Sequence, residues 1–263
     1  DDVKSRLAAK QILVPAEIEY AAELKFDGLA ISLRYEKGLL VLAAARGDGE
    51  VGEDVTANVR TIALIPQRLA RTDVLVLEVR GEVYMSFADF HRYNKLQEQR
   101  GGAPLKNPRN AAAGSVRQLD PKLTASRPLS FFAYGLGEVV GWEMPTYHSD
   151  VLLQLRELGF PVCDLKATAI GGNGLVTFYR RVAAQRESLP FGIDGVVYKV
   201  NDRDLQEALG EGTNYPHWAL AHKFEPEEVT SVLRAIEIQV GRTGKLTPVA
   251  KIEPANVGGV TIT

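Results

Sequence analysis

Apolar and polar residues alternate through the first part of the chain. Apolar side chains recur at every second position over residues 18–24, 29–35 and 39–45. A period of two is typical of a strand with one buried face. Glu36-Lys37-Gly38 supplies turn residues between the second and third segments. The pattern therefore predicts a short helix in the first ten residues, followed by a three-stranded β-meander.

Helical and strand patterns are mixed along the rest of the chain. We expect helices over residues 55–62, 86–99, 110–119, 149–158 and 175–186, and strands over residues 74–84, 129–134, 196–200 and 219–224. Ser86 and Asp89 form a possible capping box, Ser149 is expected to cap the fourth helix, and Asp194-Gly195 is expected to form a sharp turn. Because there is no regular βαβ alternation, the pattern favours the α+β class.

The end of the chain has a different pattern. From residue 229 onward the helical signals vanish, and strand patterns near 232–240, 245–253 and 257–263 are separated by Gly and Pro. We expect one domain over residues 1–226 and the beginning of a small β domain over residues 227–263. The chain starts at Asp1 and stops within a strand pattern, so we expect a piece of a longer protein.

Composition and charge narrow the classes of protein. The single cysteine, Cys163, excludes an internal disulfide and a zinc site of several thiolates, and favours a reducing cytoplasm. No apolar run approaches the roughly 18 residues that a membrane span needs. The net charge is −2, but residues 92–127 contain eight Lys or Arg and two acidic residues. That +6 segment is either a solvated helix face or a surface for an anionic partner.

Lys25 has carboxylates on both sides. Alternation puts Glu23, Lys25 and Asp27 on one strand face, and Gly28 permits close backbone approach. The group is either a surface charge cluster or a lysine nucleophile. A lysine attacks only as the neutral amine, whereas neighbouring carboxylates raise its pKa. A nucleophilic Lys25 therefore requires additional cations or a metal ion nearby.

Other strands supply such cations. Lys199 and Lys223 each lie in an apolar strand pattern that we expect to be buried. A buried, unpaired ammonium is costly, so each lysine must reach solvent or meet an anion such as phosphate. Glu78, Arg80 and Glu82 share one face of the 74–84 strand, which suits the lining of a cleft. Together these residues predict a cleft for phosphoryl or nucleotidyl transfer with a metal ion.

Five ordered motifs resemble those of covalent lysyl-adenylate enzymes. They are K-x-D-G at 25–28, R-G-E-V at 80–83, F-F-A-Y-G at 131–135, I-D-G-V-V-x-K at 193–199 and W-A-x-A-x-K-F at 218–224. The segments A-R-G-D-G at 45–49 and N-P-R-N-A-A-A-G-S at 107–115 are similar to the bacterial NAD-dependent DNA ligases, and V-G-R-T-G at 240–244 resembles the start of their OB-fold. The implied fold is a nucleotidyltransferase (ATP-grasp-like ligase) fold of antiparallel sheets flanked by helices, followed by the start of an OB-fold β-barrel.

The resemblance implies a three-step reaction. AMP passes from NAD to a lysine and then to the 5′-phosphate of a DNA nick, which is sealed. Lys25 would be the nucleophile, and Asp27, Lys199 and Lys223 would complete the catalytic set. The contacts implied for the nucleotide are Glu23 to the adenine amino group, Tyr134 to the base by stacking, Arg46 and Glu82 to the ribose side, and Lys199 and Lys223 to the α-phosphate.

The resemblance also implies a metal ion and a nucleic-acid partner. Asp27, Glu82 and Asp194 are the candidates for contacts to Mg²⁺ or its waters. Arg109 and Arg117, eight positions apart on the Ala-rich helix, would bind phosphates beside the nick in double-stranded DNA. We expect a monomer in the bacterial cytoplasm, close to the nucleoid and without membrane contact.

Two features leave alternatives open. The family has an upstream helical domain for the nicotinamide mononucleotide half of NAD and a downstream zinc finger, so we expect this piece to use NAD and seal DNA poorly, with zinc bound only beyond residue 263. An ATP-dependent ligase or capping-type nucleotidyltransferase is disfavoured by residues 107–115. A non-catalytic nick-binding scaffold is disfavoured by the intact set of Lys25, Glu82, Lys199 and Lys223. His222, beside a motif lysine, has no explanation in the sequence.

Overall fold

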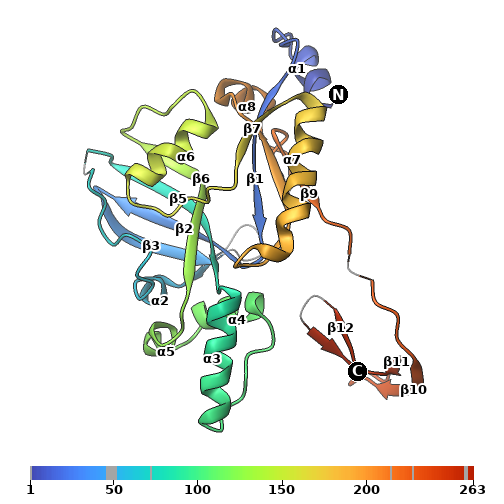
Figure 1. Ribbon diagram of the computed structural model, residues 1–263. Coiled ribbons are helices and arrows are strands. Elements are labelled where there is room, and N and C mark those ends of the chain that lie inside the picture. Colours follow the sequence, from blue (N-terminus) through green and yellow to red (C-terminus); the bar gives the residue numbers. More distant parts are fainter. Residues whose placement is uncertain (1, 46–51, 72, 214, 227, 258–259) are drawn as a thin grey trace. The chain divides into compact units, whose positions relative to one another are not determined.

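The computed structural model describes residues 2–45, 52–71, 73–213, 215–226, 228–257 and 260–263. The chain forms two compact units, Asp1–Phe224 and Glu225–Thr263 (Figure 1).

The larger unit contains two antiparallel sheets. The five-stranded sheet has the order β4 (Glu53–Asp54), β3 (Leu39–Ala45), β2 (Leu29–Glu36), β5 (Val76–Tyr84) and β6 (Ser130–Val140). The four-stranded sheet has the order β7 (Ala167–Ile170), β1 (Glu19–Phe26), β8 (Ile193–Val200) and β9 (Ala219–Lys223). Strands far apart in sequence are therefore neighbours in both sheets.

The three strands predicted at the start of the chain are present, but the predicted meander is wrong in one respect. β2 and β3 form the expected hairpin, and Lys37 and Gly38 at its turn both have positive φ. β1, in contrast, pairs with β7 and β8 in the other sheet. Alternation identifies a strand but not its partner, and Asp27 and Gly28 carry the chain from one sheet to the other.

Helices cover both sheets, and the predicted α+β class of antiparallel sheets flanked by helices is confirmed. α7 contacts three strands of the four-stranded sheet, α6 contacts β6, and α4 contacts β2 and β5 (Figure 1). The helices are α1 (Asp2–Ala9), α2 (Thr56–Val59), α3 (Phe87–Gln99), α4 (Pro108–Val116), α5 (Pro121–Ala125), α6 (His148–Glu157), α7 (Gly171–Gln185) and α8 (Arg203–Leu209), with a 3₁₀ turn at Arg186–Ser188.

Of three further caps and turns predicted at the ends of helices and strands, one is confirmed and two are wrong. Ser86 Oγ accepts a hydrogen bond from the Asp89 amide, as the capping box predicts. The predicted Ser149 cap is wrong, because α6 already begins at His148 and has no side-chain cap. The predicted turn at Asp194-Gly195 is also wrong, because both residues lie inside β8. A glycine inside a strand permits close packing of the neighbouring strand.

The smaller unit consists of two hairpins. β10 (Leu233–Val240) pairs with β11 (Leu246–Ile252), and β12 (Ala255–Val257) pairs with β13 (Val260–Ile262). The strands expected over residues 232–240 and 245–253 are present as β10 and β11, whereas the third expected segment, 257–263, holds the end of β12 and all of β13. The apolar side chains of Ile236, Ile238 and Val240 remain exposed. In the described part of the whole chain, no helix has the length and apolar character to cross a membrane.

Candidate nucleotide-binding site

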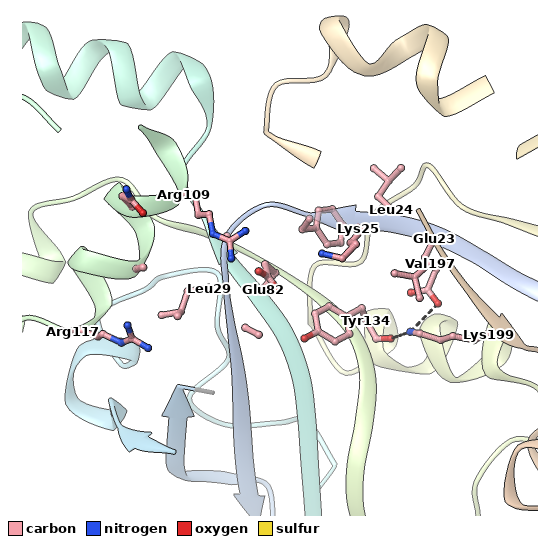
Figure 2. A pocket seen from close by; sticks show the side chains of 15 residues that line it. Glu23, Leu24, Lys25, Leu29, Glu82, Arg109, Arg117, Tyr134, Val197 and Lys199 are labelled. Atoms are coloured by element: carbon pink, nitrogen blue, oxygen red, sulfur yellow. Dashed lines mark hydrogen bonds and ion pairs between the residues drawn. The ribbon is translucent and has the colours of Figure 1, made fainter. Parts of the chain in front are cut away.

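Both sheets and α4 line a cavity of about 650 Å³ in the larger unit (Figure 2). Its size is within the range of small-molecule binding sites. Seven of the candidate residues line it: Glu23, Lys25, Glu82, Arg109, Arg117, Tyr134 and Lys199. The other lining residues are Leu24, Phe26, Gly28, Leu29, Ala30, Asn110, Ala113 and Val197.

Gly28 allows the two sheets to meet at this cavity. A Cβ at this position would lie 2.3 Å from the Val83 carbonyl oxygen and 2.9 Å from the Glu82 Cγ. Because a side chain does not fit, the sequence requires glycine where the chain leaves β1. The close backbone approach predicted for Gly28 is therefore confirmed, and it brings Glu82 of β5 next to the end of the strand that carries Lys25.

Lys25 and Lys223 lie on either side of Gly195 in the four-stranded sheet. Lys25 of β1 pairs with Gly195 of β8, which pairs with Lys223 of β9. Lys25 Nζ donates to Asp194 Oδ2 at 2.9 Å, and Lys223 Nζ lies 4.0 Å from the same oxygen. Asp194 Oδ1 is buried and has no hydrogen-bond partner among the described residues. One carboxylate thus lies beside two ammonium groups, of which that of Lys25 lines the cavity.

Glu23 and Lys199 lie beside Tyr134 (Figure 2), and together with His148 they form a buried hydrogen-bonded group. Glu23 Oε1 lies 2.9 Å from Lys199 Nζ and 2.8 Å from His148 Nε2. Lys199 Nζ also donates to the Tyr134 carbonyl oxygen at 2.6 Å and lies 5.5 Å from the ring centroid. Burial raises the pKa of Glu23, but Lys199 and His148 outweigh it and hold the pKa at about 2. This end of the cavity therefore carries a fixed carboxylate.

The structure separates two lysines that we expected at the same phosphate. Lys199 lies four positions beyond Gly195 along β8, which is about 13 Å of extended strand. It pairs with Glu23, whereas Lys25 and Lys223 share Asp194. The geometry thus favours different roles for Lys199 and Lys223.

The two motif lysines also differ in burial. Lys199 is buried as expected, but the Lys223 side chain is 68% exposed, so the prediction of burial is wrong for Lys223. β9 is the edge strand of its sheet, and most of its residues are exposed.

His222 of β9 stacks on Tyr179 of α7, and His222 Nδ1 lies 3.1 Å from the Tyr198 hydroxyl. These contacts explain His222 as a packing residue between β9 and α7.

Arg109 and Arg117, at the start and just after the end of α4, lie across the cavity from Glu23 and Lys199 (Figure 2). Lys25 and Glu82 lie between the two groups. Arg109 Nη1 donates to Asp27 Oδ1 at 2.6 Å, and Arg117 Nε lies 3.1 Å from Glu53 Oε2. Both guanidinium groups reach solvent, because their side chains are 56% and 43% exposed. They therefore present positive charge at one side of the cavity.

Glu82 is a second cavity carboxyl with a perturbed pKa, shifted in the opposite direction from that of Glu23. Burial raises its pKa to about 7, although Lys25 and the Gly28 amide act in the opposite direction. The described residues contain no group of three His, Cys, Asp or Glu that could hold a metal ion. Because Mg²⁺ is usually held by one or two carboxylates together with substrate phosphates, the roles expected for Asp27, Glu82 and Asp194 stay predictions. Arg46 lies outside the described residues.

Sequence reasoning missed His148. It lies between two motifs, and its only local signal is its place before an apolar helical pattern. Its contact with Glu23 joins residues 125 positions apart in the chain. A single sequence contains no pairing information at that range, so the structure was needed to find it.

The two sheets and the lysine- and carboxylate-lined cavity between them have the organisation expected of a lysyl-nucleotidyltransferase. Residues 3–227 match the family model of the NAD-dependent DNA ligase adenylation domain, and residues 230–263 match that of the NAD-dependent DNA ligase OB-fold domain. The chain therefore belongs to the NAD-dependent DNA ligase adenylation-domain family and continues into that family's OB-fold.

A curated relative is consistent with this membership. A DNA ligase of Stenotrophomonas maltophilia is 56% identical over 246 residues, which is 93% of this chain and 30% of that protein. The chain thus spans about a third of the length of this curated relative. Among solved structures, a mycobacterial DNA ligase D complexed with ATP and MES has a TM-score of 0.42 at 18% identity, covering 78% of this chain and 54% of its own. Another, described as Pmar-Lig_Pre, has a TM-score of 0.47 at 15% identity, covering 97% of this chain and 53% of its own.

Proposed function

We propose that this chain carries out the adenylation step of an NAD-dependent DNA ligase. Lys25 takes AMP from NAD, and the AMP then passes to the 5′-phosphate of a DNA nick before the nick is sealed. The observation that carries the proposal is the arrangement of Lys25, Asp194 and Lys223 across three adjacent strands beside the cavity. Within the longer protein, residues 1–226 form the adenylation domain and residues 227–263 begin the OB-fold domain.

The first step makes one bond and breaks one bond. NAD, when bound, supplies the AMP group and nicotinamide mononucleotide as the leaving group. Lys25 Nζ, after losing a proton, forms the P–N bond to the α-phosphorus while the bridging P–O bond breaks and its electron pair leaves with the mononucleotide. Asp194 orients the amine, and the positive charge of Lys223 stabilises the negative charge that develops on the phosphate.

The buried end of the cavity binds the base. The Glu23 carboxylate accepts the adenine amino group, and the Tyr134 ring stacks on the purine. Because Lys199 is held beside Glu23, we assign it to the adenine edge and assign the α-phosphate to Lys223. The edge of adenine offers an amino group as donor next to a ring nitrogen as acceptor. The Glu23 carboxylate can accept from the amino group, and the Lys199 ammonium can donate to the ring nitrogen.

The middle of the cavity holds the ribose and the metal ion. Glu82 contacts the ribose side, and we keep Arg46 in the same role from the motif that it shares with the family. Asp194 Oδ1 is a buried carboxylate oxygen without a donor among the described residues, so it fits a hard cation such as Mg²⁺. Glu82 and Asp27 are the further candidates for contacts to the ion or its waters. Mg²⁺ would neutralise charge on the phosphates.

Nicked double-stranded DNA is the partner that we assign to the α4 side. Arg109 and Arg117 line the cavity with exposed guanidinium groups, which suits contacts to backbone phosphates. We infer that the longer protein acts as a monomer, in the bacterial cytoplasm and close to the nucleoid.

The proposal is tested with α-phosphate-labelled NAD and ATP. The chain is assayed alone and fused to the flanking segments of the Stenotrophomonas relative, with Mg²⁺ and with nicked or intact duplex DNA. We expect label on the protein from NAD but not from ATP, and release of AMP only with nicked DNA. Transfer from ATP instead of NAD would support an ATP-dependent nucleotidyltransferase. Nick binding without label from either donor would support a non-catalytic scaffold.

A further inference from the structure

His148 is held in place by the fold. It begins α6, and its backbone amide donates to the Asn201 carbonyl oxygen at 2.8 Å. The next amide, of Ser149, donates to Asn201 Oδ1 at 2.9 Å. Asn201 itself is 2% exposed and directly follows β8. The helix start is therefore fixed to the strand that carries Lys199, and the imidazole is directed at Glu23.

The groups around the imidazole favour a proton on Nε2. Lys199 Nζ has three N–H groups, of which two are used by the Tyr134 carbonyl oxygen and Glu23. His148 Nε2 lies 2.8 Å from Glu23 Oε1 and 3.1 Å from Lys199 Nζ. Without a proton on Nε2, its lone pair would face the carboxylate oxygen and take the third N–H of Lys199. With a proton on Nε2, His148 donates to Glu23, and Lys199 keeps one N–H for a ligand.

Resting on the proposed function, we propose that His148 is a positioning residue that determines selectivity for adenine. Its Nε2–H fixes Glu23 Oε1, so that the other carboxylate oxygen and the third N–H of Lys199 face the base in one order. Adenine, with an amino group next to an unprotonated ring nitrogen, fits that order. Hypoxanthine, with a carbonyl next to a ring N–H, meets an acceptor with an acceptor and a donor with a donor.

Binding of AMP and IMP to the 263-residue chain tests this role, because the two ligands differ only in the base edge. We expect His148→Met to weaken AMP binding about tenfold or more, to change IMP binding little, and so to bring the ratio of the two Kd values toward one. His148→Gln, which can place an amide N–H near the position of Nε2, should restore much of the ratio. The exposed His91→Gln on α3 is the matched control and should leave both Kd values unchanged.

Equal losses of AMP and IMP affinity in His148→Met, or an unchanged ratio, would overturn the proposal, because a merely structural role predicts either. If the variants do not fold, ¹⁵N NMR of the His148 ring in the unsubstituted chain gives the answer: a proton on Nε2 supports the role and an Nδ1–H tautomer overturns it. Failure of the unsubstituted chain to bind AMP in preference to IMP would instead contradict the base site of the proposed function.

Discussion

The two ends of strand β8, which runs beside the cavity, hold similar groups in different environments. At one end, Glu23 and Lys199 are buried, and His148 and the Tyr134 carbonyl oxygen complete their hydrogen bonds. At the other end, Lys25 and Asp194 are each 28% exposed, and Asp194 Oδ1 has no partner among the described residues.

We propose that this difference in surroundings separates recognition of the base from reaction at the lysine. A buried hydrogen-bond network is rigid, which suits a site that reads the fixed edge of a base. A partly exposed ion pair is weaker than a buried one and can exchange partners. This suits a lysine that must release its proton and accept a phosphoryl group. The same two residue types thus serve different purposes because the fold gives them different surroundings.

The largest expected effect comes from Lys25→Arg. Arginine retains the positive charge beside Asp194, but it does not lose its proton under these conditions. We expect AMP transfer to fall about 10⁴-fold or more, while AMP binding remains within about tenfold. Single-turnover labelling with NAD in the fused chain, together with AMP titration, measures both. Strong loss of AMP binding would show that the two ends are not independent.

Stability measurements on the two motif lysines test the contrast in burial. Lys199→Met leaves the buried Glu23 carboxylate without its main counter-charge, so we expect the free energy of unfolding to fall by about 3 kcal/mol. The exposed Lys223→Met should lower it by less than about 1 kcal/mol. Urea denaturation at pH 7.5 distinguishes them. Similar values for both variants would contradict the difference between the two ends.

Glu82 also lines the cavity and should give the structure a pH dependence. In the folded chain its carboxyl holds its proton up to about pH 7, whereas it ionises near its ordinary pKa when unfolded. Its contribution to stability is therefore complete at low pH and is lost as pH rises through 7. Glu82→Gln should gain about 2 kcal/mol of unfolding free energy relative to the unsubstituted chain between pH 5 and pH 8.

The control for this measurement is Glu157→Gln, an exposed position on α6. We expect this substitution to leave the difference between pH 5 and pH 8 as it is in the unsubstituted chain. A gain in Glu157→Gln equal to that in Glu82→Gln would show that the effect comes from net charge and not from burial at the cavity.

The smallest expected effect concerns the α4 side. Replacing Arg109 and Arg117 together by Ala should weaken binding of nicked DNA and reduce the slope of log K against log salt by about 2, while AMP binding to the chain changes little. Binding measured between 50 and 200 mM salt tests this. Arg180→Ala, an exposed position on α7, is the control. An unchanged slope in the double variant would remove the α4 arginines from the DNA interface.

Much of the cavity was predictable because its residues lie in short motifs on strands. Alternation correctly placed Glu23 and Lys25 on one face of β1, and the motifs identified Glu82, Tyr134 and Lys199, which the structure brings to the same cavity. The hairpin of β2 and β3 was predictable from its turn residues, because its contacts are local.

The remaining features depend on long-range pairing. β1 pairs with strands that begin more than 140 residues later, so its sheet was not evident from alternation. The register of β8, which separates Lys199 from Lys25, and the contact of His148 with Glu23 arise in the same way. The exposure of Lys223 follows from the edge position of β9, which local apolarity does not reveal.

The central claim, that Lys25 is the nucleophile, is tested most directly by locating the covalent adduct. The fused chain is incubated with NAD and Mg²⁺, digested under conditions that preserve the P–N bond, and analysed by peptide mass spectrometry. The account predicts one adenylyl group on the peptide that contains Lys25, and none on the peptides that contain Lys199 or Lys223. An adduct on either of those lysines, with Lys25 unmodified, would contradict it.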